Sequence, residues 1–358
     1  MNKIAVKIIF CCSIVLLSTS LIRQNAEAAT VGFEPVSEVS GVPWGLAQLS
    51  ENTIIYTLRK GEVGLVDITT GKTTPLTGLP TVASIGQGGL LDVAVPMDYT
   101  AGQWIYFTYS KLNNKLAVTT LARAKLVGTK LTEWTDLLVS NSGTSKGQHF
   151  GSRITFDDDG YVYFGIGDRG VRENSQNLDN HAGTIMRLKR DGSSPEIYSY
   201  GHRNPQGLTY DHKTKRLWEA EHGPRGGDEI NLIEKGKNYG WPIISYGKEY
   251  WGPIAVGEGT AKEGMEQPVK TYIPSIAPSS LVVYHGDVFP EWEGDLLLGA
   301  LVKTHINHIE LDDAGKVVKE TRFLESLGER IRALLVTKDG QIYFSTDSGK
   351  IMRLVAEK

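Results

Sequence analysis

One strand pattern occurs six times along this chain of 358 residues. Each copy is a short run of alternating apolar residues, such as Gly160–Ile166 (GYVYFGI) or Gly340–Thr346 (GQIYFST). The other four copies are Asn52–Leu58, Gln103–Tyr109, Arg216–Glu221 and Gly294–Ala300. A second apolar strand precedes each copy, and turns such as Asp157–Gly160 (DDDG) separate several of the pairs. The repetition predicts an all-β fold, a six-bladed β-propeller with four-stranded blades, because radial closure hides most sheet edges.

A two-layer β-sandwich with a long insertion is the alternative fold, but a sandwich gives no reason for one hairpin to occur six times. Helical periodicity is nearly absent, and the 40 glycines suit the many tight turns that short strands need. The longest interval between copies, from Glu221 to Gly294, predicts a large loop excursion over Gly247–Ile276.

The first 28 residues are predicted to be a secretory signal peptide. Lys3 and Lys7 precede a mostly apolar stretch, Ile8–Ile22, and Ala26–Ala28 (AEA) fits an A-x-A cleavage site. A transmembrane anchor is the alternative, but the apolar stretch is short and contains serine and threonine. A lipoprotein signal fits less well, because the bulky Phe10 precedes the first cysteine. We therefore expect an exported protein, periplasmic or secreted, without a membrane span and with residues 29–358 as one propeller domain.

Charge and cysteine content argue against nucleic acid binding and against cysteine chemistry. Lys and Arg number 38 and Asp and Glu 41, so the net charge of −3 gives no electrostatic reason to expect a nucleic acid partner. Both cysteines, Cys11 and Cys12, lie in the predicted signal peptide. The mature domain is therefore expected to form no disulfide and to use no thiolate chemistry.

Polar residues precede the first strand of several predicted blades. In a propeller this strand lines the central channel, so residues just before it gather at one mouth of the channel. The set comes from four blades and consists of Gln87, His149, Arg203, Asn204, Arg330 and Arg332. We expect these residues to form one ligand site, held on loops by a rigid scaffold.

His149 is the strongest candidate for a general base, since a base that works near neutral pH is usually a histidine oriented by a carboxylate. Asp168, in Gly167–Gly170 (GDRG), ends the second strand of the same predicted blade and is expected to be that carboxylate. A structural histidine with satisfied hydrogen bonds is the alternative. The position of His149 at the predicted channel mouth favours catalysis.

Four basic residues also belong to the predicted mouth, namely Arg203, Lys303, Arg330 and Arg332. Cations gathered at one place repel each other unless an anion lies between them, and guanidinium groups suit carboxylates. The set therefore favours an anionic ligand. Surface salt bridges are the alternative, because the 41 acidic residues supply many partners.

The segment Glu221–Glu229 (EHGPRGGDE) combines glycines, whose carbonyls can turn inward, with carboxylates. Hard cations such as Ca²⁺ take oxygen ligands of this kind. A glycine-rich surface turn explains the segment equally well, and the acidic residues lack the spacing of an EF-hand loop. No set of His and Cys supports a zinc site.

Five segments of the chain resemble a known family. They are Gly86–Leu91 (GQGGLL), Gly147–Arg153 (GQHFGSR), Tyr200–Leu208 (YGHRNPQGL), the cluster Glu221–Asn231 and Asn238–Pro242 (NYGWP). In this order they resemble the soluble aldose sugar dehydrogenases of the glucose/sorbosone dehydrogenase family, which depend on pyrroloquinoline quinone (PQQ). That family has a six-bladed propeller fold, in agreement with the repeat count.

The resemblance implies a site for PQQ, which carries three carboxylates, and two roles for Ca²⁺. The implied PQQ-binding residues are Gln87, Arg203, Asn204, Tyr250, Lys303, Arg330 and Arg332. The carbonyls of Gly223 and Pro224 match a calcium site at the quinone, whereas Glu229 and Tyr239 match a structural calcium site. His149 matches the family's general base and Asp168 matches its partner.

The resemblance also implies a reaction, the oxidation of an aldose at C1 to an aldonolactone. His149 would take the proton of the anomeric hydroxyl while the C1 hydride moves to PQQ, and an external acceptor would then receive the electrons. His222 and Arg225 are more similar to the branch that accepts many aldoses than to the glucose-selective branch. A calcium-dependent lactonase and a non-catalytic carbohydrate-binding propeller are the alternative functions. A monomer and a homodimer are both consistent with the sequence.

Overall fold

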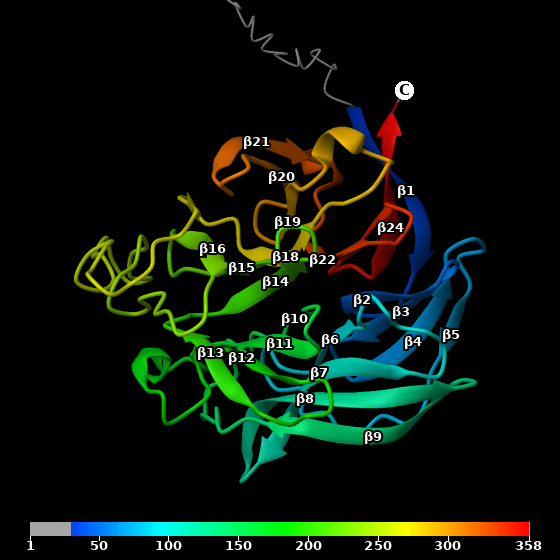
Figure 1. Cartoon of the computed structure of the whole chain (residues 1–358), viewed down its shortest axis with the longest axis horizontal. Coiled ribbons are helices and arrows are strands. Elements are labelled where there is room, and N and C mark those ends of the chain that lie inside the picture. The colour runs from blue at the N-terminus through cyan, green and yellow to red at the C-terminus, as the bar shows by residue number, and fades with distance from the viewer. Residues whose placement is uncertain (1–29, 358) are drawn as a thin grey trace, which may run out of the picture.

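The computed structural model describes residues 30–357, which form six separate four-stranded antiparallel sheets. The sheets are arranged radially around a common axis (Figure 1). This confirms the prediction of an all-β, six-bladed β-propeller with four-stranded blades, and the β-sandwich alternative is wrong. The predicted signal peptide, residues 1–28, lies outside the described residues. Within residues 30–357, no helix has the length and apolar character needed to cross a membrane.

The first five blades follow chain order from their inner to their outer strand. Blade 1 contains β2 (Pro43–Ser50), β3 (Thr53–Leu58), β4 (Glu62–Asp67) and β5 (Thr73–Pro75), and blade 2 contains β6 (Leu90–Ala94), β7 (Trp104–Asn113), β8 (Leu116–Val127) and β9 (Lys130–Val139). Blade 3 contains β10 (Ile154–Phe156), β11 (Tyr161–Ile166), β12 (Thr184–Lys189) and β13 (Glu196–Tyr200), and blade 4 contains β14 (Pro205–Asp211), β15 (Arg216–Glu221), β16 (Asp228–Ile233) and β17 (Lys270–Tyr272).

The last two blades complete the ring. Blade 5 contains β18 (Pro278–Val283), β19 (Leu296–Ala300), β20 (Ile306–Leu311) and β21 (Val317–Phe323), and blade 6 contains β22 (Ile331–Val336), β23 (Ile342–Thr346), β24 (Lys350–Glu357) and β1 (Thr30–Glu38). Short 3₁₀ helices lie in three connections of the described chain, namely η1 (Arg172–Gln176), η2 (Pro290–Trp292) and η3 (Glu325–Leu327).

The six repeated strands are the second strands of the six blades, and β11 shows why they are apolar on both faces. Val162 and Phe164 belong to a buried cluster with residues of blade 2. Tyr163, on the opposite face, belongs to a cluster with Leu208 and Leu217 of blade 4. The second strand of each blade lies between the two neighbouring blades. Side chains on both of its faces therefore become buried.

The two ends of the described chain meet in blade 6. β1 pairs with β24 in antiparallel register, with Phe33 opposite Leu354 and Ser37 opposite Ile351. Figure 1 shows the blue strand β1 beside the red strand β24. The first strand of the domain thus becomes the outer strand of its last blade. This pairing closes the ring with backbone hydrogen bonds, a step that the repeat pattern did not predict.

The loop excursion has different bounds from the predicted Gly247–Ile276. It spans residues 234–269, between β16 and β17, and leaves blade 4 at the left of Figure 1. Within the predicted range, Lys270–Tyr272 instead forms the outer strand of blade 4, where Thr271 pairs with Glu229. The error arose because a strand of three residues is too short to give a periodic signal.

Candidate active site

The residues that precede the inner strands gather at one mouth of the channel. They line a cavity of about 160 Å³, here called the axial cavity, to which all six blades contribute. Four of the predicted cofactor-binding residues are in its wall, namely Gln87, Asn204, Arg330 and Arg332. The remaining wall residues are Trp44, Arg59, Leu91, Phe150, Gly151, Gln206, His222 and Leu301. The sequence did not indicate Arg59 or Trp44, because each lies in or after a strand rather than just before one.

His149 adjoins this cavity and contacts the predicted carboxylate partner. Its Nδ1 lies 2.6 Å from Asp168 Oδ1, and its backbone N–H donates to Gln87 Oε1 at 2.8 Å. Asp168 also accepts hydrogen bonds from Trp241 Nε1 at 2.9 Å and from the backbone N–H of Gly170 at 2.7 Å. An ionised Asp168 can only accept a hydrogen bond here, so Nδ1 carries the hydrogen and Nε2 carries the lone pair. Within residues 30–357, Nε2 has no hydrogen-bond partner.

Burial and charge set the protonation of this pair. Burial lowers the pKa of His149, and the Arg203 guanidinium lowers it further, although the Asp168 contact opposes both effects. The pKa of Asp168 lies below its ordinary value in spite of burial, because its carboxylate accepts the His149 hydrogen bond. At neutral pH the histidine is therefore neutral and the aspartate ionised, as a general base and its orienting partner should be.

Arg203 lines a smaller hollow beside the axial cavity. Its guanidinium donates to the carbonyl of His222 at 2.9 Å and to the hydroxyl of Tyr250 at 3.3 Å. The smaller hollow is lined by Arg203 together with all four predicted metal-binding residues, Gly223, Pro224, Glu229 and Tyr239. His222 lies in the walls of both cavities, so the four predicted metal residues lie next to the four predicted cofactor residues of the axial cavity.

His222 keeps a fixed tautomer at this junction. Its Nε2 lies 2.6 Å from the carbonyl of Pro278, which can only accept, so Nε2 carries the hydrogen and Nδ1 is an acceptor. Burial lowers the pKa of His222 to about 3, and the nearby charge of Arg203 contributes. His222 is therefore a neutral acceptor across the physiological range. The sequence indicated this residue only through the family resemblance.

The basic residues are not all at the cavity, and two of them share a partner. Arg330 Nε and Arg332 Nε each donate to Asp347, at 2.8 and 2.7 Å. Both residues therefore pair with Asp347 and also line the axial cavity. Lys303 is exposed and absent from the wall, because the turn after β19 brings Leu301 to the cavity and carries Lys303 outward.

Arg153 closes the channel beneath the axial cavity. Its guanidinium donates to Asp92 Oδ1 at 2.8 Å and to the carbonyl oxygens of Gln206, Trp44 and Arg332 at 3.1, 3.4 and 3.5 Å, so it reaches four other blades. On its far side lies a second cavity of about 190 Å³, lined mainly by apolar residues of the inner strands. The Arg153–Asp92 pair thus separates the axial cavity from the opposite mouth.

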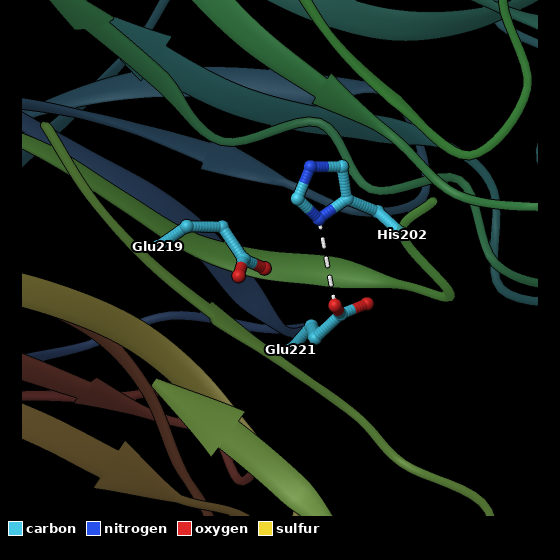
Figure 2. Close-up of side chains that lie close together, drawn as sticks. All are labelled: His202, Glu219 and Glu221. Carbon is cyan, nitrogen blue, oxygen red and sulfur yellow. Dashed lines mark ion pairs between the residues drawn. The ribbon is translucent and has the colours of Figure 1, made fainter. Parts of the chain in front are cut away.

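A buried carboxylate cluster lies in blade 4, next to the predicted structural calcium residues. Figure 2 shows Glu219 and Glu221 facing His202, and the ligand atoms of the three residues all lie within 4.8 Å of one another. Glu229 pairs with Glu221 across β15 and β16, and the ring of Tyr239 stacks on His202 with 4.8 Å between centroids. Burial and the charge of Glu221 raise the pKa values of Glu219 and Glu229 well above their usual range. These oxygen-rich groups fit a hard cation.

Comparisons with known proteins identify relatives of this chain. The sequence matches the glucose/sorbosone dehydrogenase family over residues 41–353. It is 37% identical to the aldose sugar dehydrogenase YliI of Escherichia coli (strain K12), over 92% of this chain and 94% of that protein. The apo-form structure of the soluble aldose sugar dehydrogenase from Escherichia coli has a TM-score of 0.87 at 36% identity, covering 92% of this chain and 100% of that one. The structure of the PQQ-bound form of the aldose sugar dehydrogenase from Streptomyces coelicolor has a TM-score of 0.76 at 27% identity. The match covers 93% of this chain and 100% of that one.

Proposed function

Because the chain belongs to the glucose/sorbosone dehydrogenase family, we propose that it is an exported enzyme that oxidises aldose sugars at C1 with PQQ and calcium. The product would be an aldonolactone, and the electrons would pass to an external acceptor. One observation carries the proposal: the His149–Asp168 pair adjoins a cavity lined by guanidinium and amide groups.

The chemistry of the cavity wall suits a ligand with several carboxylates. Arg59, Arg330 and Arg332 offer guanidinium donors, and Asn204 and Gln87 offer amides. Asp347 neutralises part of this charge but leaves the set with excess positive charge. Guanidinium groups bind carboxylates in a bidentate way, so these residues would hold the acid groups of PQQ. Arg203 and Tyr250 would hold it from the side of the smaller hollow. Lys303 stays a proposed ligand that would need the turn after β19 to move inward.

The residues of this chain would supply the proton transfer and the positioning. When bound, PQQ supplies a quinone that takes up two electrons and calcium supplies positive charge beside it. His149 Nε2 would accept the proton of the C1 hydroxyl, and Asp168 would stabilise the imidazolium that results. Loss of that proton together with the C1 hydride turns the cyclic sugar into its lactone. The apolar rings of Trp44 and Phe150 in the cavity wall would limit the access of water.

The proposed calcium sites use the smaller hollow. The carbonyls of Gly223 and Pro224 would hold the ion that faces the cofactor, and both residues line the hollow beside Arg203. Glu229 and Tyr239, which line the same hollow, would hold the structural ion. The buried acidic groups behind this hollow support the choice of a hard divalent cation.

A reconstitution experiment tests the function. The purified protein, freed of metal with a chelator, is given PQQ and Ca²⁺, and aldose-dependent reduction of a redox dye is measured together with the lactone produced. We expect activity only when both additions are present. Binding of PQQ without any sugar-dependent dye reduction would overturn the proposal. Hydrolysis of added lactones without PQQ would favour the lactonase alternative, and sugar binding without any turnover would favour a carbohydrate-binding propeller.

A further inference from the structure

Three buried side chains of blade 4 enclose a space that suits one metal ion. Glu219 and Glu221 are two residues apart on β15 and therefore point to the same face of the sheet. His202, in the loop before β14, faces both of them (Figure 2). Their ligand atoms lie within 4.8 Å of one another. That spacing is about twice a Ca²⁺–oxygen distance of roughly 2.4 Å, so one ion would reach all three residues.

Two atoms that face this space lack partners. Glu219 Oε1 and His202 Nδ1 are buried, and neither has a hydrogen-bond partner within residues 30–357. In the same part of the chain, no Lys or Arg forms an ion pair with Glu219 or Glu221; the one charge contact is that of Glu221 with His202 Nδ1 at 3.4 Å. Buried charges without compensation are costly. We infer that Glu219, Glu221 and His202 bind a divalent cation, and that this ion holds the cofactor-binding segment Arg203–Asn204 in place.

The surroundings of His202 orient it as a metal ligand. Its Nε2 lies 2.8 Å from the hydroxyl of Ser199, and a hydrogen on Nε2 leaves the Nδ1 lone pair directed at the carboxylates. A second ring nitrogen that donates to a neighbouring group is the usual arrangement for histidine ligands. Asn231 provides a further oxygen, since its Nδ2 donates to Glu219 Oε2 at 3.0 Å while its Oδ1 has no partner among the described residues.

Glu221 connects this ion to the axial cavity. Its Oε2 accepts the backbone N–H groups of Arg203 at 2.5 Å and of Asn204 at 3.1 Å, whereas its Oε1 faces His202. One carboxylate therefore binds the ion with one oxygen and fixes the cofactor-binding segment with the other. Because coupling between two sites is reciprocal, the cation would tighten cofactor binding and the cofactor would tighten cation binding. The coupling between the cation and the cofactor rests on the proposed function.

The first experiment uses the metal-free protein without PQQ or sugar. We expect Ca²⁺ to raise the melting temperature of the wild type and Glu219→Gln to lose most of that rise. In chelator, Glu219→Gln should melt at or above the wild-type temperature, because the amide keeps the size of the side chain and does not repel the nearby carboxylate of Glu221. The order should reverse in Ca²⁺, a crossover that a purely structural role for Glu219 would not produce.

A matched control and an independent readout make this test decisive. Glu320→Gln changes a partly buried glutamate of blade 5 that pairs with Lys270 of blade 4 and with Arg322, and it should keep the full Ca²⁺ response. Equilibrium dialysis should find one calcium ion fewer per chain in Glu219→Gln. If that variant fails to fold, Tb³⁺ luminescence sensitised through the stacked Tyr239 replaces it. His202→Gln should then lose the part of the signal that comes from this site, while Tb³⁺ at the proposed structural site keeps the rest. An unchanged calcium content and melting response in both variants would overturn the inference.

The second experiment measures PQQ affinity by absorbance at saturating Ca²⁺. We expect Glu219→Gln to weaken PQQ binding about tenfold, within the usual range of coupling between sites. Equal affinity in wild type and variant would overturn the coupling, even if the cation site is present. A wild type that binds calcium but no PQQ would instead overturn the proposed function and leave the cation site standing.

Discussion

His149 Nδ1 and Asp168 Oδ1 lie 2.6 Å apart although 19 residues separate them in the chain. The hairpin of β10 and β11 accounts for this contact, because one residue precedes the hairpin and the other follows it at the same end. Trp241, from the loop excursion of blade 4, donates to the second oxygen of Asp168 and fixes the carboxylate from the other side. The base and its partner are thus held by two blades.

Replacement of Asp168 by Asn should test whether Asp168 orients His149 for catalysis, without disturbing the fold. The amide keeps the size of the side chain but removes the charge that stabilises the imidazolium and selects the Nε2 lone pair. We expect kcat for aldose oxidation to fall by roughly 10²–10⁴-fold, with PQQ affinity nearly unchanged. Asp157→Asn, at the opposite end of the same hairpin, is the control and should retain kcat. A kcat of Asp168→Asn close to that of the wild type would exclude the pair from the mechanism.

The pH dependence of kcat/KM follows from the lowered pKa of His149. A base must be unprotonated, so activity should fall as the pH drops through that pKa, which lies below the ordinary value of 6.5. The acid limb should disappear in His149→Ala, whose residual rate should be several orders of magnitude lower while PQQ stays bound. Steady-state rates in buffers of constant ionic strength measure the profile. An acid limb centred above pH 6.5 would show that another group controls it.

Arg332 should contribute more to PQQ binding than Arg330 does. Arg332 is nearly buried and forms two hydrogen bonds with Asp347, whereas Arg330 is about half exposed and forms one. Solvent screens exposed charges, so Arg332→Met should weaken PQQ binding by about 10–100-fold and Arg330→Met by less. Arg322→Met, on the outer strand of blade 5, is the control and should bind PQQ normally. Titration of PQQ against each apoprotein gives the ranking, and equal losses in the two channel variants would contradict it.

The features that depend on repeated strands could be predicted from the sequence. The partners of individual side chains and the direction in which a turn points a residue could not. Six alternating strands sufficed for the fold. The positions before or at the start of the inner strands bring Gln87 and Arg332 to one cavity, with His149 bonded to Gln87 beside it. Asp347 escaped notice because, unlike Asp168, it follows a second strand in a blade that offered no candidate base in need of a carboxylate. Lys303 was expected at the mouth, but a short turn directs it outward, and turn geometry has no periodic signal. Strand β1 escaped because its partner lies at the other end of the chain.

His285 should make stability depend on pH. It bridges Asp211 of blade 4, at 2.9 Å, and Glu293 of blade 5, at 2.7 Å, and these hydrogen bonds raise its pKa. The protonated form is favoured in the folded state, so its contribution is present below about pH 6.5 and is lost as the pH rises through the raised value. His285→Gln should therefore lower the melting temperature at about pH 5.5 and change it little at about pH 8.5. A pH-independent difference would contradict the bridge.

The Arg153–Asp92 pair should show the asymmetry of a buried ion pair. Arg153 is buried in the channel, and Asp92 accepts both its guanidinium and the backbone N–H of Ile154. Arg153→Met would leave the Asp92 carboxylate buried without its cation, so we expect a loss of about 3–5 kcal/mol in the free energy of unfolding, measured with urea.

The double variant Arg153→Met/Asp92→Leu distinguishes charge compensation from packing. Removing both charges leaves apolar groups of similar size, so the stability should recover most of the loss of Arg153→Met. The backbone of Arg332 would still lack its guanidinium donor, which lies 3.5 Å from the carbonyl in the wild type. PQQ binding should therefore stay weaker than in the wild type even where stability is restored. A double variant as unstable as the single one would show that the contacts of Arg153 with Trp44 and Gln206, rather than its charge, stabilise the channel.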